Sequence, residues 1–279
     1  MAKYRRILKI KEEDDKLPST RKELFRRMIK DDAYLMIDLS LAETLFSLPL
    51  YVVFALEYAF LTGVEPKAGN FFPIIFYMGL AAIICWGIKY VGRGAAFSVM
   101  KKRVHNEGCF ITAELLRFIK TSGPKCFFAG VILGVSAFVA FSGSAYLLML
   151  SDTFLKWTAT GVLILQFALF FGAAEFFAAS ESFYELKFFS QFKNSFSLAI
   201  SGFFAVLLHF FVYFGIKFTA ALFSPWAAIV AVMVCALYFN GLSVAVATLY
   251  AHRKFDIYIN QENYPEYVDK GLLKKKEVE

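Results

Sequence analysis

The sequence lacks most of the features that identify a soluble enzyme or a metalloprotein. Its four cysteines form no CxxC pair and have no histidine at metal-ligand spacing, so we predict neither a metal site nor a cofactor. The HExxH, GxSxG, GxxxxGK[ST] and GxGxxG motifs are missing, and we therefore predict that the protein is not an enzyme. The N-terminal stretch MAKYRRILKIKEEDD has no apolar core before a small-residue cleavage site, so no cleaved signal peptide is expected.

Apolar residues are abundant instead. Hydrophobic residues make up 58% of the 279 positions, with 34 Phe and a mean hydropathy of +0.56, whereas soluble domains average about 45–50% apolar residues. The surplus is concentrated in six segments, each long enough to cross about 30 Å of hydrocarbon as a helix. These segments are 34–62, 71–92, 125–150, 153–179, 196–222 and 225–250. We predict an all-α polytopic membrane protein with a basic segment 1–32, a six-helix domain 33–251 and a tail 252–279.

The charges indicate an orientation for these spans. With the N-terminus inside, 27 of the 30 Lys and Arg residues lie on the inner side, and Lys67, Lys156 and Lys217 lie outside. Short inner loops carry an excess of Lys and Arg in membrane proteins. We therefore predict a multi-pass protein of the cell membrane with both termini in the cytoplasm. Its basic charge then faces anionic lipid head groups and requires no nucleic acid.

The stretch 109–120 is too short to span the bilayer and alternates at helical spacing. Leu115, Leu116 and Ile119 fall on an apolar face, with Glu114 expected on the polar side. We predict an amphipathic helix lying at the membrane interface between the second and third spans. The sequence ELLRFIKTS at 114–122 resembles ELKFFSQFKNS at 185–195, which indicates either an internal duplication or two similar interfacial segments.

Ionisable residues inside the apolar spans are candidates for function, because charges in a bilayer are costly. Six of them are expected at the cytoplasmic boundary, where opposite charges can pair helix to helix or form a substrate or ion site. They are Asp38, Glu43, Lys89, Arg93, Glu175 and Glu181. We favour structural pairing for this layer.

Three further polar residues are expected together near the midplane, one on each of the last three spans: Gln166, His209 and Asn240. Such a cluster can hold helices together or line a polar path. We favour the structural role, because no carboxylate is expected beside His209 at that depth.

Several stretches resemble the YesL-like family of bacterial membrane proteins. They are SLAETLFSLPL (40–50), GRGAAFSVMKKRVHNEGCFITAELLRFIKTS (92–122), FKNSFSLAI (192–200) and FDIYINQENYPEYVDKGL (255–272). Ser40 and Glu43 stand where family members often carry Asn and Trp. The resemblance implies a polytopic bacterial protein connected with carbohydrate uptake, and it implies no catalytic residues.

Two functions follow from these observations. In the first, the protein is transport-associated, accessory to or part of a small-molecule uptake system with carbohydrate as a candidate substrate, and its partner is a permease or another membrane protein. In the second, it is a non-catalytic scaffold or regulatory protein that binds partner proteins or anionic lipid. Transport requires a polar path through the bilayer, whereas a scaffold requires only packed helices.

Overall fold

The structure is a computed structural model that describes residues 7–8, 17–62, 68–147, 151–223 and 225–273, and helices dominate it, which confirms the all-α prediction. The helices are α1 (Arg21–Asp31), α2 (Ala33–Thr62), α3 (Ala68–Val104), α4 (Ile111–Thr121), α5 (Gly123–Leu147), α6 (Thr153–Phe183), α7 (Phe188–Ser201), α8 (Phe203–Phe223), α9 (Pro225–Val234), α10 (Asn240–Phe255) and the short α11 (Gln261–Asn263). Two-residue strands, β1 (Ile7–Leu8) and β2 (Cys109–Phe110), form an antiparallel pair with Ile7 opposite Phe110.

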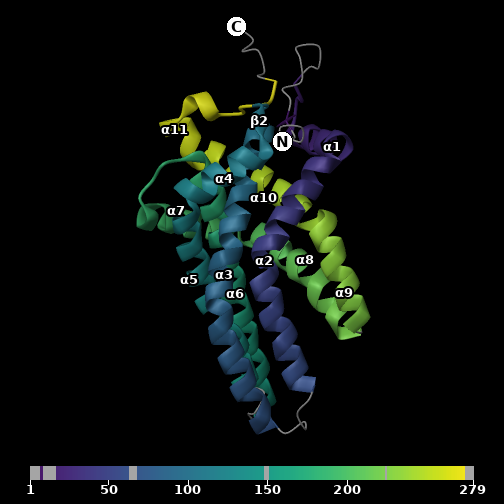
Figure 1. Cartoon of the computed structure of the whole chain (residues 1–279). Helices are drawn as coiled ribbons and strands as arrows, with labels where there is room; N and C mark the ends of the chain where they lie inside the picture. Colours follow the sequence, from purple (N-terminus) through teal and green to yellow (C-terminus); the bar gives the residue numbers. More distant parts are fainter. Residues whose placement is uncertain (1–6, 9–16, 63–67, 148–150, 224, 274–279) are drawn as a thin grey trace.

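Four long helices run side by side and form the body of the molecule (Figure 1). These helices, α2, α3, α5 and α6, correspond to the first four predicted spans. Helix α3 contains 37 residues, which at 1.5 Å per residue is far longer than the hydrocarbon core of a bilayer. Its basic end, which includes Lys101 and Lys102, therefore extends beyond the apolar layer as a continuous helix.

The fifth predicted span, 196–222, is not one straight helix. The chain bends by 92° between α7 and α8, so this segment is either a broken span or a re-entrant one. The break falls at Gly202, which has the lowest helix propensity after proline. Figure 1 shows that the α8–α9 hairpin ends well short of the far ends of α2 and α3. The described residues thus contain five helices long and apolar enough to span a membrane, or six spans if the bent pair counts as one.

The sixth predicted span, 225–250, is helical and longer than expected. Helix α9 passes through a π-helical turn, Cys235–Phe239, directly into α10, which continues to Phe255. The predicted boundary between residues 251 and 252 therefore falls inside a continuous helix.

The amphipathic segment is helical, as predicted, but Glu114 does not lie on its polar face. In α4, Leu116 is exposed, whereas Glu114 is buried and hydrogen-bonds Ser98 on α3. Arg117 also donates to the two carboxylate oxygens of Glu114, at 3.0 and 2.6 Å. Placing Glu114 on the polar face was wrong, because helical periodicity does not show that a neighbouring helix offers a hydroxyl to a carboxylate. Helix α7 likewise precedes α8, so both similar segments form short helices before longer ones.

Small residues allow the long helices to approach closely. A Cβ at Gly130 of α5 would lie 2.5 Å from the carbonyl oxygen of Trp86, and one at Gly134 would lie 2.8 Å from that of Ile83. Both contacts are with α3. Interfaces between membrane helices are enriched in small residues for this reason. The face of α5 that carries Gly130 and Gly134 therefore packs against α3 of the same chain.

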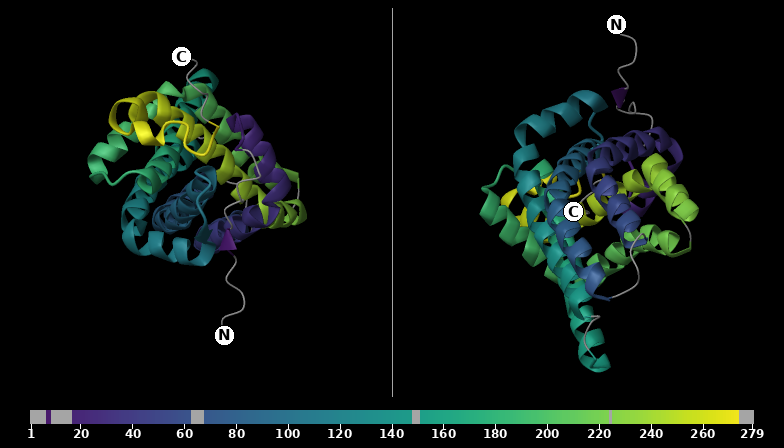
Figure 2. Two further views of the ribbon diagram at one scale, coloured as in Figure 1. Left: turned by 90° about the horizontal axis from the view of Figure 1, so that it is seen from above. Right: turned by 60° about the horizontal axis from the view of Figure 1, so that its bottom comes forward.

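Ion pairs connect the first helix to the C-terminal segment at the basic end of the bundle. Arg21 of α1 pairs with Asp256 and Asp269. The carboxylate of Glu107 accepts from Lys102 and Lys270; partial burial would raise its pKa, but these hydrogen bonds outweigh that effect and lower the pKa to about 2. Glu107 therefore stays ionised at neutral pH. Viewed from this end in Figure 2, the C-terminal segment lies across the helices.

The orientation can be tested by labelling single cysteines in a background without the four native ones. We expect Ser151→Cys, at the start of α6, to react with an impermeant thiol reagent added to intact cells, and Lys120→Cys, on α4, to react only after lysis. Both positions are exposed. Labelling of Lys120→Cys in intact cells would reverse the predicted orientation.

Close packing between α3 and α5 predicts different responses at two glycines. Gly130→Ala places a methyl group against the Trp86 carbonyl and should destabilise the protein by about 1–3 kcal/mol. Gly161→Ala on α6 has nothing within 4 Å of the new Cβ and should leave stability unchanged or raise it. Thermal unfolding in one detergent compares the two variants, and equal melting temperatures would contradict the packing.

Candidate functional site

The guanidinium of Arg93, on α3, lies buried between two carboxylates from different helices. Its Nη1 donates to Glu43 Oε2 of α2 at 2.6 Å. Its Nε and Nη2 donate to Glu175 Oε1 and Oε2 of α6 at 3.0 and 2.7 Å, which is a bidentate contact. The side chains of Arg93, Glu43 and Glu175 are 1%, 0% and 8% exposed. We name these three residues the ionic cluster.

Hydroxyl groups complete the hydrogen bonds of the ionic cluster. Tyr90 donates to Glu175 Oε1 at 3.0 Å, and Tyr213 of α8 donates to Glu43 Oε1 at 2.9 Å. Ser243 Oγ of α10 accepts from Arg93 Nη2 at 3.0 Å. Five helices, α2, α3, α6, α8 and α10, therefore contribute to one buried network.

A second cation lies beside the ionic cluster. The ammonium of Lys89 is 4.6 Å from the centre of the Trp86 ring and 4.9 Å from that of Tyr213, as in cation–π contacts. Lys89 is 3% exposed. With both carboxylates and both cations ionised, the local charge sums to zero, which is the condition under which buried charges are tolerated.

The Gly-Arg-Gly sequence at 92–94 brings Arg93 to this position. A Cβ at Gly92 would lie 2.6 Å from Cβ of Phe46 on α2. At Gly94 it would lie 2.7 Å from Cys126 Sγ on α5. Without side chains on either side of Arg93, α2 and α5 can pack directly against α3, which encloses the guanidinium.

The structure brings together four of the six residues predicted at the cytoplasmic boundary, Glu43, Lys89, Arg93 and Glu175. Glu181 lies on α6, six residues after Glu175, and instead accepts a hydrogen bond from Lys125 Nζ of α5 at 2.8 Å. The half-buried Asp38 on α2 is not among the groups that hydrogen-bond Arg93. The sequence did not single out the hydroxyls of Tyr90, Tyr213 and Ser243, although each is three or four positions from a residue that it did single out.

The three residues expected at the midplane have separate partners. Gln166 donates to Ser136 of α5 at 2.8 Å. Asn240 donates to Thr44 of α2 at 3.1 Å. His209 instead joins the ionic cluster: its Nε2 lies 3.4 Å from Ser243 Oγ.

The expectation that no carboxylate lies beside His209 was wrong. Its Nε2 is 3.9 Å from Glu175 Oε2. The physical reason is the break at Gly202. Because α8 begins there, His209 lies only two turns into the helix, at the level of the ionic cluster and not at the middle of a straight span.

A cavity of about 310 Å³ adjoins this histidine, between α6, α8 and α10. His209 and Glu175 lie on its wall, and most of the remaining lining is aliphatic or aromatic, including Phe171, Val206 and Ala247. Neither Gln166 nor Asn240 lines it. The cavity is therefore a largely apolar space that borders the buried network at His209 and Glu175.

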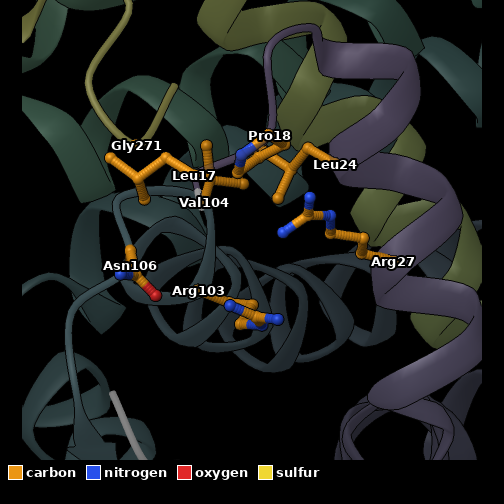
Figure 3. Close-up of a pocket in the computed structure, with 8 residues that line it drawn as sticks. All are labelled: Leu17, Pro18, Leu24, Arg27, Arg103, Val104, Asn106 and Gly271. Carbon is orange, nitrogen blue, oxygen red and sulfur yellow. The ribbon is translucent and has the colours of Figure 1, made fainter. Parts of the chain in front are cut away.

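Figure 3 shows a second, much smaller cavity of about 20 Å³ at the basic end, near Arg27 and Arg103. Both guanidinium groups are engaged: Arg27 donates to Glu23 and Arg103 to Asp32, each at 2.6 Å. A space of this size holds about one water molecule. We therefore place the candidate site at the ionic cluster and the larger cavity.

The described residues contain no group of three or more His, Cys, Asp or Glu side chains arranged to hold a metal ion. Comparison with protein-family models, with curated proteins and with solved structures found no match. The resemblance to the YesL-like family is thus neither supported nor contradicted by these comparisons.

Charge balance in the ionic cluster can be tested with two variants of Arg93. Arg93→Met leaves two buried carboxylates and one cation, and should cost about 3 kcal/mol or more, as breaking buried ion pairs does. Arg93→Met combined with Glu175→Gln restores neutrality between Glu43 and Lys89, so it should recover part of that loss.

Thermal unfolding of both variants in the same detergent measures the difference. A double variant no more stable than Arg93→Met alone would show that charge balance does not hold these helices together. Gln166→Leu, on α6 but paired with Ser136, serves as a control for loss of a polar side chain elsewhere.

Proposed function

We propose that the protein is a transport-associated component of the cell membrane, accessory to or part of a small-molecule uptake system, with its basic end in the cytoplasm. The observation that carries the proposal is the ionic cluster, which is buried in helices apolar enough to span a membrane and has His209 on the wall of a cavity. Ionisable groups within membrane-spanning helices cost free energy, and they commonly mark substrate or ion pathways.

The lining of the cavity favours the accessory role over direct carriage of sugars. A carbohydrate presents many hydroxyl groups, each of which needs a hydrogen-bond partner when it leaves water. The cavity offers His209, Glu175 and Tyr250 as polar side chains in a largely apolar wall. A carbohydrate-uptake role, as the YesL-like resemblance implies, therefore fits a protein that assists a permease. The proposal includes no enzymatic activity.

The scaffold function is favoured by a different observation. Each member of the ionic cluster is hydrogen-bonded within the chain, as in a rigid structural core. In that case the buried network fixes helix positions, and the basic end, with its exposed Arg26 and Lys120, binds anionic lipid or partner proteins.

Uptake by cells separates the two functions. We expect His209→Leu to reduce uptake from a panel of radiolabelled carbohydrates in the native host, per amount of folded protein in the membrane. Gln166→Leu should leave uptake per folded protein unchanged, since Gln166 hydrogen-bonds Ser136 and does not line the cavity. Folded protein is quantified by fluorescence-detected size-exclusion chromatography.

The scaffold function predicts another result. Uptake would then follow the amount of folded protein in both variants, with no specific effect at His209. That outcome would defeat the assignment of the ionic cluster and its histidine to transport.

A further inference from the structure

The cavity beside His209 has the properties of a ligand site that is entered from the bilayer. It lies within the candidate spanning helices α6 and α10, next to α8, and Ala205 and Leu208 on its wall are exposed at the surface of the protein. Its volume of about 310 Å³ is at the lower end of the range for small-molecule pockets, roughly 300–1,000 Å³. A molecule that reaches it through these apolar surfaces has to be soluble in hydrocarbon.

The imidazole of His209 offers one hydrogen-bonding atom to this space. Its Nε2 faces Ser243 and Glu175, whereas its Nδ1 hydrogen-bonds no residue in the described part of the chain. The ring is held by stacking on Phe171 and Tyr213, at centroid distances of 5.6 and 6.2 Å and interplanar angles of 21° and 29°. Its side chain is 21% exposed, and it lines the cavity, so the free nitrogen is fixed in place and accessible.

The surrounding charges select a neutral head group. Glu175 is the carboxylate on the cavity wall, and it repels an anionic ligand. Arg93 already pairs with Glu175 through a bidentate contact, so the carboxylate is not available to a cationic ligand without breaking that pair. An uncharged group avoids both costs.

A hydroxyl is the uncharged group that suits His209 in either tautomer. If Ser243 donates to Nε2, then Nδ1 carries the proton and donates to the ligand; if Nε2 donates to Ser243, then Nδ1 accepts. A hydroxyl can both donate and accept, whereas a carbonyl can only accept. The rest of the ligand has to be apolar to match Val206, Val212 and Val246.

We propose that the cavity between α6, α8 and α10 binds a neutral, membrane-soluble alcohol, with its hydroxyl on His209 Nδ1 and its hydrocarbon along α8. The site would recognise a long-chain or lipid alcohol in the bilayer. This binding does not depend on the transport role, because it requires no movement of a solute across the membrane.

Photolabelling of the full-length protein in phosphatidylcholine vesicles tests the proposal. The probe is hexadecanol carrying a diazirine on its chain, compared with the same diazirine in hexadecane and in hexadecanoic acid. We expect the alcohol to label α6, α8 and α10 about fivefold more than the alkane, the ratio given by one hydrogen bond of about 1 kcal/mol. Labelled residues are identified by peptide mass spectrometry.

Two variants locate the site. His209→Phe keeps an aromatic ring for stacking but removes both nitrogens, so the alcohol should lose its preference over the alkane. Ala205→Trp fills the cavity and should abolish labelling by the alcohol at these helices. Ala81→Trp, at an exposed alanine of α3 that does not line the cavity, is the matched control and should label like the wild type.

Equal labelling by alcohol and alkane in the wild type, or an undiminished preference in His209→Phe, would overturn the proposal. Stronger labelling by the acid would overturn the neutral head group. Competition on the wild-type protein does not depend on folding of the variants: excess unlabelled hexadecanol should displace the probe, and hexadecane should not.

Discussion

The arrangement of the helices depends on one constraint: the buried Arg93 guanidinium needs counter-charges and hydrogen-bond acceptors that water does not supply. Glu43 and Glu175 provide its counter-charges, and Tyr213 and Ser243 contribute from two more helices. A buried guanidinium that loses a partner costs more than most single side-chain contacts contribute. Five helices are thus held in one relative arrangement by hydrogen bonds that converge on a single region, while phenylalanines and small residues fill the space around it.

Hydropathy in the sequence was sufficient to predict five long apolar helices and the short helix α4, and the ionisable residues within the spans were sufficient to single out Glu43, Lys89, Arg93 and Glu175. They could not show which side of a helix faces the centre of the bundle. Glu175 and Glu181 are six positions apart, about 240° around the helix axis, and they pair with Arg93 and Lys125, respectively. The position of His209 was missed for another reason: a continuous apolar run conceals a sharp bend when a single glycine causes it.

The larger cavity and the ionic cluster share Glu175 and are coupled through it. A group that displaces His209 or alters the field at Glu175 acts directly on the carboxylate that holds Arg93. Because Arg93 also binds Glu43, a change on the lipid-facing side of α8 can reach α2 through two ion pairs. Binding of a molecule from the bilayer is therefore coupled to helix packing through His209, Glu175 and Arg93.

The order of the charges along the chain has a consequence for biosynthesis. Glu43 and Arg93 are 50 residues apart on adjacent spans, so the hairpin of α2 and α3 carries an ion pair of its own as it leaves the ribosome. Glu175 follows 82 residues after Arg93, when Lys89 is already in place to balance it. Lys89 therefore lacks a counter-charge until α6 delivers Glu175, and only then do the four charges sum to zero. The last helices, α8 and α10, close around a network that is already balanced.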